Sequence, residues 1–202
     1  MRKKRTMENS VNIDHLKEFP IFEGISEEFL SRIAQRMSFH RKPKYHYIYM
    51  ADELSEHVFF LIKGAVKIGT HSAEGREAIK AILHPMAIFG ELCLIGEEKR
   101  QDFARGMNTE IQYYSISATA FQELMREHHP LSLNFLQLIG NRLRRVENRL
   151  ESLVFKDART RIIEFIKDSA SKRGRRVGYE MLLKHCLTQQ DIANLTGTSR
   201  QT

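Results

Sequence analysis

The sequence predicts an α+β fold in which a strand-rich middle part lies between two helical parts. Apolar side chains at helical spacing occupy residues 14–37, although Pro20 and Gly24 interrupt them. Short runs typical of β-strands fill residues 38–117. From residue 118 onward the pattern is helical again, first amphipathic and then polar and basic.

The strand-rich part consists of short apolar runs that turn residues separate. These runs are HYIYM, HVFFLIKG, AVKIGTH, EAIKAIL and EIQYYSIS, and the glycines between and beside them are Gly64, Gly69, Gly75, Gly90, Gly96 and Gly106. Many short strands with regular turns are typical of a small barrel or sandwich. The sequence has no evident internal repeat and no low-complexity segment.

A heptad ladder follows within residues 118–155. Its members, at alternating steps of three and four, are Leu136, Ile139, Leu143, Val146, Leu150 and Leu153. This spacing predicts a seam between two parallel copies over residues 131–154, with Arg142 and Glu147 spaced as an ion pair between the copies. Leucine at the first position with isoleucine or valine at the second favours higher oligomers in isolated coils. The alternative is one amphipathic core helix. Residues off the seam, Leu131, Phe135 and Leu138, are expected to face the strands.

The last sixteen residues, LTQQDIANLTGTSRQT, outline a helix-turn-helix. Thr188 and Asp191 form an N-terminal capping pattern, Ala193 is small where a second helix would cross, and Gly197 supplies the turn. Thr198 and Ser199 then offer the N-cap of a second helix. We therefore expect the chain to continue in a longer protein. The alternative is an ordinary helical hairpin with a glycine turn.

Composition and charge narrow the class of protein. The 202 residues are 42 % hydrophobic and 28 % charged, with no apolar run long enough to suggest a membrane span or a signal peptide. Only two cysteines, Cys93 and Cys186, are present, which fits a reducing cytoplasm. Ten Lys or Arg face five acids within residues 156–202, and residues 1–5 are also basic. A basic end suits a DNA-binding segment, although a solvated basic face is the alternative for the N-terminal run.

The order of strand-rich domain, long dimerising helix and helix-turn-helix resembles bacterial transcription regulators of the cyclic-AMP receptor protein and fumarate–nitrate regulator (CRP/FNR) family. FGEL at residues 89–92, Ser-Ile-Ser at 115–117, the seam, DARTRI at 157–162 and the last sixteen residues carry this resemblance, which runs from about Phe19 to Thr202. It implies a double-stranded, jelly-roll-like β-roll effector domain with N-terminal helices (14–117). It further implies a helical dimerisation segment (118–155) and an incomplete winged helix-turn-helix domain (156–202).

The resemblance also implies residue roles in the effector site. Gly90, Glu91 and Leu92 match a turn that holds a cyclic nucleotide through backbone N–H groups and a carboxylate. The family's phosphate-binding Arg-Ser pair falls on Gln101 and Asp102, and Arg100 lies one residue away. Because aspartate repels phosphate, and a slip of one residue in an extended segment reverses a side chain, cyclic AMP is disfavoured as the effector. The effector is expected to be another small molecule of unknown identity.

For DNA, the resemblance implies base reading by Arg200, flanked by Ser199 and Gln201. Thr188, Gln189 and Gln190 are expected to contact phosphates. The implied partners are double-stranded DNA, a second copy of the chain and RNA polymerase, with no membrane. Effector binding is expected to reorient the DNA-binding parts through a hinge near Phe155–Ala158.

Other chemistries fit the residues less well. An iron–sulfur cluster needs about four thiolates, and the histidines lack the spacing of a haem or metal ligand set, so no metal is expected. No catalytic constellation or phosphate-cradling motif stands out, so we expect no enzyme activity. A regulatory subunit that binds an effector and acts on protein partners is the alternative function, since β-rolls also occur without DNA-binding domains.

Overall fold

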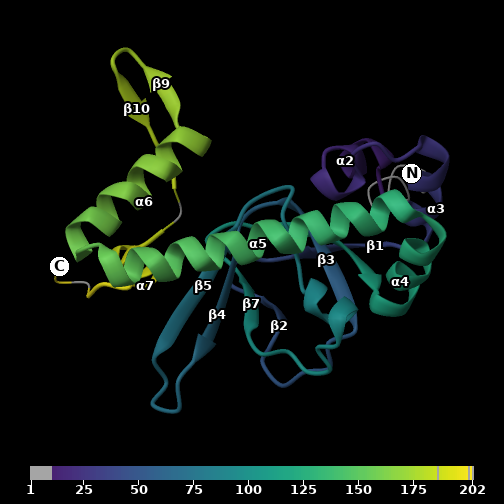
Figure 1. Cartoon of the computed structure of the whole chain (residues 1–202), viewed down its shortest axis with the longest axis horizontal. Helices are drawn as coiled ribbons and strands as arrows, with labels where there is room; N and C mark the ends of the chain where they lie inside the picture. Colours follow the sequence, from purple (N-terminus) through teal and green to yellow (C-terminus); the bar gives the residue numbers. More distant parts are fainter. Residues whose placement is uncertain (1–10, 186, 200, 202) are drawn as a thin grey trace.

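The computed structural model describes residues 11–185, 187–199 and 201, and it places one long helix across a β-roll (Figure 1). The chain begins with α2 (Ile13–Lys17), η1 (Pro20–Phe22) and α3 (Glu27–Gln35). Asn12 and Ser26 cap the two α-helices by accepting hydrogen bonds from backbone N–H groups two or three residues on. These helices bury Leu16, Phe19 and Phe22 against the roll, as the helical spacing of residues 14–37 predicts.

The roll consists of two four-stranded antiparallel sheets. Its strands are β1 (Ser38–Lys42), β2 (Tyr47–Tyr49), β3 (His57–Lys63), β4 (Val66–His71), β5 (Glu77–Leu83), β6 (Ile88–Phe89), β7 (Phe103–Gly106) and β8 (Ile111–Ser117). One sheet has the order β1-β8-β3-β6 and the other the order β2-β7-β4-β5, which leaves β5 at an edge. The predicted strand runs correspond to β2, β3, β4, β5 and β8.

Alternation along β3 separates two hydrophobic cores. Val58 and Phe60 pack with the N-terminal helices and the helices that follow the roll, whereas Phe59 and Leu61 point into the roll. The first core also holds Leu131, Phe135 and the half-buried Leu138 of the long helix. The prediction that these three residues face the strand domain is thereby confirmed.

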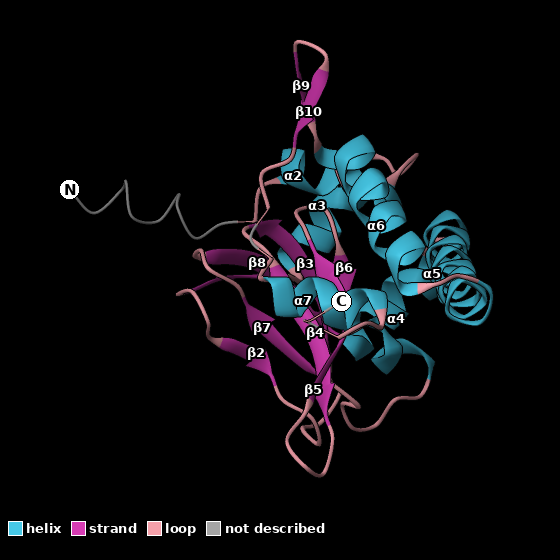
Figure 2. Cartoon of the chain, turned by 90° about the vertical axis from the view of Figure 1, so that its left-hand side faces the viewer, coloured by secondary structure: helices cyan, strands magenta, loops and turns pink. Residues whose placement is uncertain are grey.

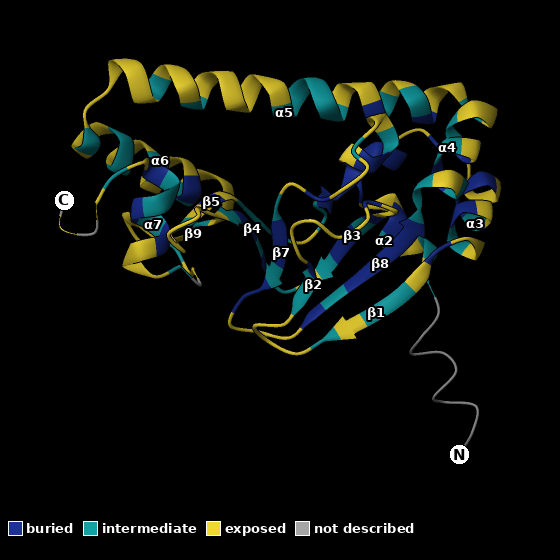
Figure 3. Cartoon of the chain, turned by 90° about the horizontal axis from the view of Figure 1, so that it is seen from below, coloured by how far each residue is buried: buried dark blue, intermediate teal, exposed yellow. Residues whose placement is uncertain are grey.

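The helical part comprises α4 (Ala118–Glu127), the 27-residue α5 (His129–Phe155) and α6 (Ala158–Arg173). A hairpin of β9 (Arg175–Val177) and β10 (Glu180–Leu182) projects beyond α6, and α7 (Gln189–Thr196) returns to lie against β5 (Figures 1 and 2). Much of α5 is exposed, whereas most residues of β7 and β8 are buried (Figure 3). In the described parts of the chain, no helix is both long and apolar enough to cross a bilayer.

Candidate effector site and DNA-binding segment

The predicted effector turn follows β6 and opens the short helix η2 (Glu91–Ile95). Gly90 has a φ of 71°, in the left-handed region that favours glycine. A Cβ at this position would lie 2.9 Å from Nη1 of Arg100, 2.9 Å from Cδ2 of Phe59 and 3.0 Å from the carbonyl oxygen of His57. Backbone conformation and crowding therefore both require glycine here.

Glu91 carries the buried carboxylate of this turn. Its side chain is only 2 % exposed, and Oε1 accepts a hydrogen bond from Arg142 of α5, which also donates to the carbonyl of Ile88. The other oxygen, Oε2, is buried and has no hydrogen-bond partner. Burial raises the pKa of Glu91, and the charge of Arg142 opposes this shift. Arg142, which the heptad pattern pairs with Glu147 of a second copy, thus binds within its own chain.

Arg100 lies beside the turn rather than facing away from it. Its guanidinium donates to the carbonyl oxygens of Gly90 (2.9 Å) and His57 (2.6 Å) and lies 3.4 Å from Oε2 of Glu97. The group also lies over the ring of Tyr49, 4.4 Å from its centre. Arg100 is 2 % exposed, and its Nε has no partner.

The two residues after Arg100 point elsewhere. Gln101 is exposed and donates to the carbonyl oxygen of Lys99 (3.3 Å), while Asp102 accepts from Tyr49 (3.2 Å) and Lys80 (3.0 Å). The prediction for Gln101 treats this segment as extended, with successive side chains on opposite faces. Before β7, which begins at Phe103, backbone hydrogen bonds hold residues 98–100 opposite residues 52–55, with an isolated antiparallel bridge between Leu54 and Lys99. Side chains do alternate here, since Arg100 is buried and Gln101 exposed, so the inward position falls on Arg100 and not on Gln101.

An aromatic stack fills the roll next to Arg100. The ring centres of Tyr49 and Phe59 lie 5.7 Å apart, and those of Phe59 and Phe89 lie 5.1 Å apart. Burial raises the pKa of Tyr49, and its hydroxyl therefore stays protonated as the donor to Asp102. The site thus joins a buried cation, a carboxylate with one unpaired oxygen and aromatic surface. This set suits a small ligand with an anionic group and a hydroxyl.

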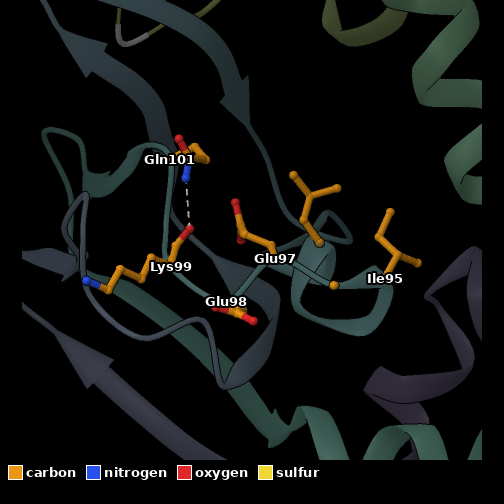
Figure 4. Close-up of a pocket in the computed structure, with 7 residues that line it drawn as sticks. Ile95, Glu97, Glu98, Lys99 and Gln101 are labelled. Atoms are coloured by element: carbon orange, nitrogen blue, oxygen red, sulfur yellow. Dashed lines mark hydrogen bonds between the residues drawn. The ribbon is translucent and has the colours of Figure 1, made fainter.

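A cavity of about 630 Å³ opens on the outer side of η2 (Figure 4). Its lining residues are Leu92, Ile95, Gly96, Glu97, Glu98, Lys99 and Gln101. Leu92, which the resemblance assigns to the effector turn, is 41 % exposed here, and Gln101 donates to the carbonyl of Lys99 within the loop. Of the predicted effector residues, the structure thus gathers Gly90, Glu91 and Arg100, and it turns Gln101 outward.

The predicted DNA-binding residues lie around α7. Thr188 and Asp191 form a reciprocal capping box, with N···O distances of 2.9 and 3.1 Å, and Gly197 has a φ of 65°. Gln189, Gln190, Ser199 and Gln201 are exposed, as is Thr188, while Ala193 is buried. Arg200 lies outside the described residues.

Most of the predicted seam is exposed on α5. Leu136, Leu143, Val146 and Leu150 are 63 %, 59 %, 65 % and 63 % exposed. Ile139 is half-buried and packs on the core of the roll, so it contributes to that core as well as to the predicted seam. Leu153 is 44 % exposed and lies 2.7 Å from where a Cβ on Gly197 would stand. An apolar stripe therefore runs along the outer face of α5.

The sequence does not predict the contacts of two arginines on α5. Arg142 binds Glu91 across 51 positions of the chain, and Arg149 reaches backbone groups of both β5 and α7. Neither pairing leaves a spacing signal in the sequence. Among the residues that the structure describes, no group of three or more His, Cys, Asp or Glu side chains is arranged to hold a metal ion.

Comparison with known proteins agrees with this architecture. The family model for the cyclic nucleotide-binding domain matches residues 39–128. A CRP-like cAMP-activated global transcriptional regulator of Mycobacterium tuberculosis is 29 % identical over 182 residues, covering 90 % of this chain and 81 % of the relative. A global nitrogen regulator of Synechocystis is 28 % identical, over 77 % of this chain and 69 % of that protein.

Solved structures show the same fold. A mutant of CooA from Carboxydothermus hydrogenoformans superposes with a TM-score of 0.71 at 25 % identity, covering 95 % of this chain and 80 % of the other. The c-di-GMP-responsive global regulator CLP of Xanthomonas campestris gives a TM-score of 0.70 at 21 % identity, with 87 % of each chain covered. The chain thus carries a cyclic nucleotide-binding domain over residues 39–128, and with the roll, the Gly90–Glu91 turn and the long helix it is similar to CRP-like transcription regulators.

Proposed function

We propose that this protein is a homodimeric, sequence-specific DNA-binding transcription regulator of the cytoplasm whose DNA affinity is set by a small effector in the β-roll. One observation carries the proposal: Glu91 of the effector turn is paired with Arg142 on the helix that bears the exposed apolar stripe. The same chain then ends in a capped helix and glycine turn with exposed polar side chains. The names of the relatives support the regulatory role, and RNA polymerase is the protein partner that this role implies.

The Glu91–Arg142 pair supplies a route from the effector to the dimer. An effector that hydrogen-bonds the unpaired Oε2 of Glu91 competes with or reinforces the bond to Arg142, and so biases the position of α5. Beyond α5, Arg161 donates to the carbonyls of Lys156 (2.6 Å) and Thr196 (2.8 Å), which ties the α5–α6 joint to the end of α7. The effector shifts DNA affinity only as far as it binds the two arrangements differently.

The effector in this proposal is not cyclic AMP. Arg100 is already bonded to two carbonyls and faces Glu97, so a phosphate must displace these partners. Asp102 adds a second carboxylate close by, through Tyr49. Titration calorimetry on the natively purified protein should therefore show cyclic AMP binding no tighter than high micromolar.

Cyclic AMP is nevertheless a second candidate, because Arg100 lies beside Gly90 and the Mycobacterium tuberculosis relative is named as cAMP-activated. Low-micromolar or tighter binding that Arg100→Met abolishes, and that the exposed control Lys99→Met leaves intact, would select this candidate. A melting curve for each variant separates loss of binding from loss of fold.

Selection from a random pool of DNA duplexes tests the regulatory function itself. The expected result is enrichment of a near-palindromic site whose half-sites are about 34 Å apart, since two recognition helices enter successive major grooves. The alternative, a regulatory subunit that acts on protein partners, predicts no enrichment of any sequence.

A further inference from the structure

The structure fixes α7 to the β-roll of its own chain at the edge strand β5. Asn194 of α7 donates from Nδ2 to the carbonyl of Glu77 (3.3 Å), at the start of β5. On β4, Lys67 lies 2.7 Å from Glu77 and 3.6 Å from Asp191, and all three side chains are largely shielded from solvent. Charge pairs with little exposure are screened less than surface pairs, so these contacts fix α7 at its first turn as well as along its length.

Arg149 of α5 contacts both β5 and α7 where these two elements meet. Its guanidinium donates to the carbonyls of Lys80 (3.0 Å) and Ile79 (3.5 Å) on β5 and to that of Asn194 (3.4 Å) on α7. One planar fork thereby bridges three elements that lie far apart in the sequence. Figure 2 shows α7 in front of β4 and β5.

The backbone acceptors that Arg149 uses arise from local structure. The pairing of β4 with β5 shifts between Ile68 and Gly69, where Ala81 and then Ile79 are the partners, so Lys80 is the extra residue of a β-bulge. As β5 is also an edge strand, its outer carbonyls need a donor from elsewhere. On α7, Asn194 lies in the last turn, where carbonyls lack partners within the helix and a cation is favourable.

The docked face of α7 is not its predicted DNA face. Asp191 and Asn194 point to the roll, whereas Thr188, Gln189 and Gln190 are exposed, as are Ser199 and Gln201 beyond the turn. The contact with β5 therefore presents the DNA-reading residues and does not cover them.

We propose that Arg149 is a positioning residue for DNA binding, because it holds α7 on β5. The DNA-reading turn is then oriented by two parts of the chain, the α5–α6 joint and the β-roll. This inference rests on the proposed function for its effect on DNA, but the docking is measurable without DNA. Without Arg149, the segment must be ordered when DNA binds, and that ordering weakens the specific complex.

Hydrogen exchange on the full chain tests the docking. Arg149→Met should increase the exchange rate of amides in residues 189–196 about tenfold or more, because charge-assisted hydrogen bonds to three carbonyls are lost. Arg149→Lys, which keeps the charge but not the fork, should give a smaller increase. Arg145→Met removes the same charge from an exposed position on the same helix and should change nothing there.

DNA affinity tests the positioning role. On a duplex selected by the unmodified protein, Arg149→Met should raise the dissociation constant about tenfold. On random DNA, Arg149→Met should weaken binding little more than Arg145→Met does. Unchanged exchange in α7, unchanged specific affinity or tighter specific binding would each overturn the proposal. If Arg149→Met lowers the melting temperature too far, Asn194→Ala, which removes the bond from Nδ2 to the carbonyl of Glu77, tests the docking of α7 on β5 with smaller loss of packing. Should no duplex be selected at all, the proposed function fails, while the exchange result still decides whether Arg149 holds α7.

Discussion

Replacing Leu143 with aspartate should separate the proposed dimer. In a single chain Leu143 is 59 % exposed, and dimerisation along the predicted seam would bury most of this exposed surface. Full burial of a leucine side chain stabilises by about 1.5–3 kcal/mol, which scales to about 1–2 kcal/mol here and about 2–4 kcal/mol for the two copies. Loss of that term alone raises the dissociation constant roughly 30-fold to several hundredfold. Two aspartates facing each other raise it further.

Sedimentation equilibrium at micromolar concentration measures this change directly. Leu143→Asp and Leu150→Asp should both sediment as monomers, and the unmodified chain as a dimer. Asn148→Asp adds the same charge on an exposed position of α5 that lies off the seam, and it should remain dimeric. Unchanged dimers for both leucine variants would refute the assignment of this stripe to the interface.

Three further outcomes follow from the site and the DNA-binding segment. Gly90→Ala should lower the free energy of unfolding in urea by more than the ~1–2 kcal/mol of left-handed strain, because its Cβ meets three atoms. Gly96→Ala is the control: its φ is 103° and the space around it is open, so it should show the backbone strain alone. Thr188→Ala removes a capping box and should destabilise α7 by about 0.5–2 kcal/mol, seen as faster amide exchange; equal exchange would mean that tertiary contacts alone hold the helix. Arg200→Ala should cost roughly 1–3 kcal/mol on a selected site and much less on random DNA, and an equal loss on both would make Arg200 a phosphate contact.

The sequence predicts those parts of the fold whose pattern is local. Strands such as β3 and β8 are apolar and long, so they stand out, and the capping box at Thr188 needs only residues three apart. β1 is SFHRK, mostly polar, and β6 has two residues; neither carries a period that can be recognised. Their places depend on pairing with β8 and β3, which is a long-range property.

The site shows the same division. Gly90 and Glu91 can be found by motif, because a left-handed glycine before a short helix is a local requirement. The position of Arg100 follows from a loop whose shape depends on backbone bonds to Asp52 and Glu53, 47 or more residues earlier. Arg142 fits a heptad position equally well whether it binds a second copy or Glu91, so the sequence alone does not choose between them.

The proposed function requires that a small molecule in the roll sets the affinity for DNA. The most direct test compares the natively purified protein with the same preparation after its bound small molecules are removed by reversible unfolding, using fluorescence anisotropy on a selected duplex at fixed salt. We expect at least a tenfold difference in dissociation constant, which adding back the released small-molecule fraction removes and which Glu91→Gln does not show. Equal affinity before and after removal, with full refolding of the protein, would contradict the proposed function.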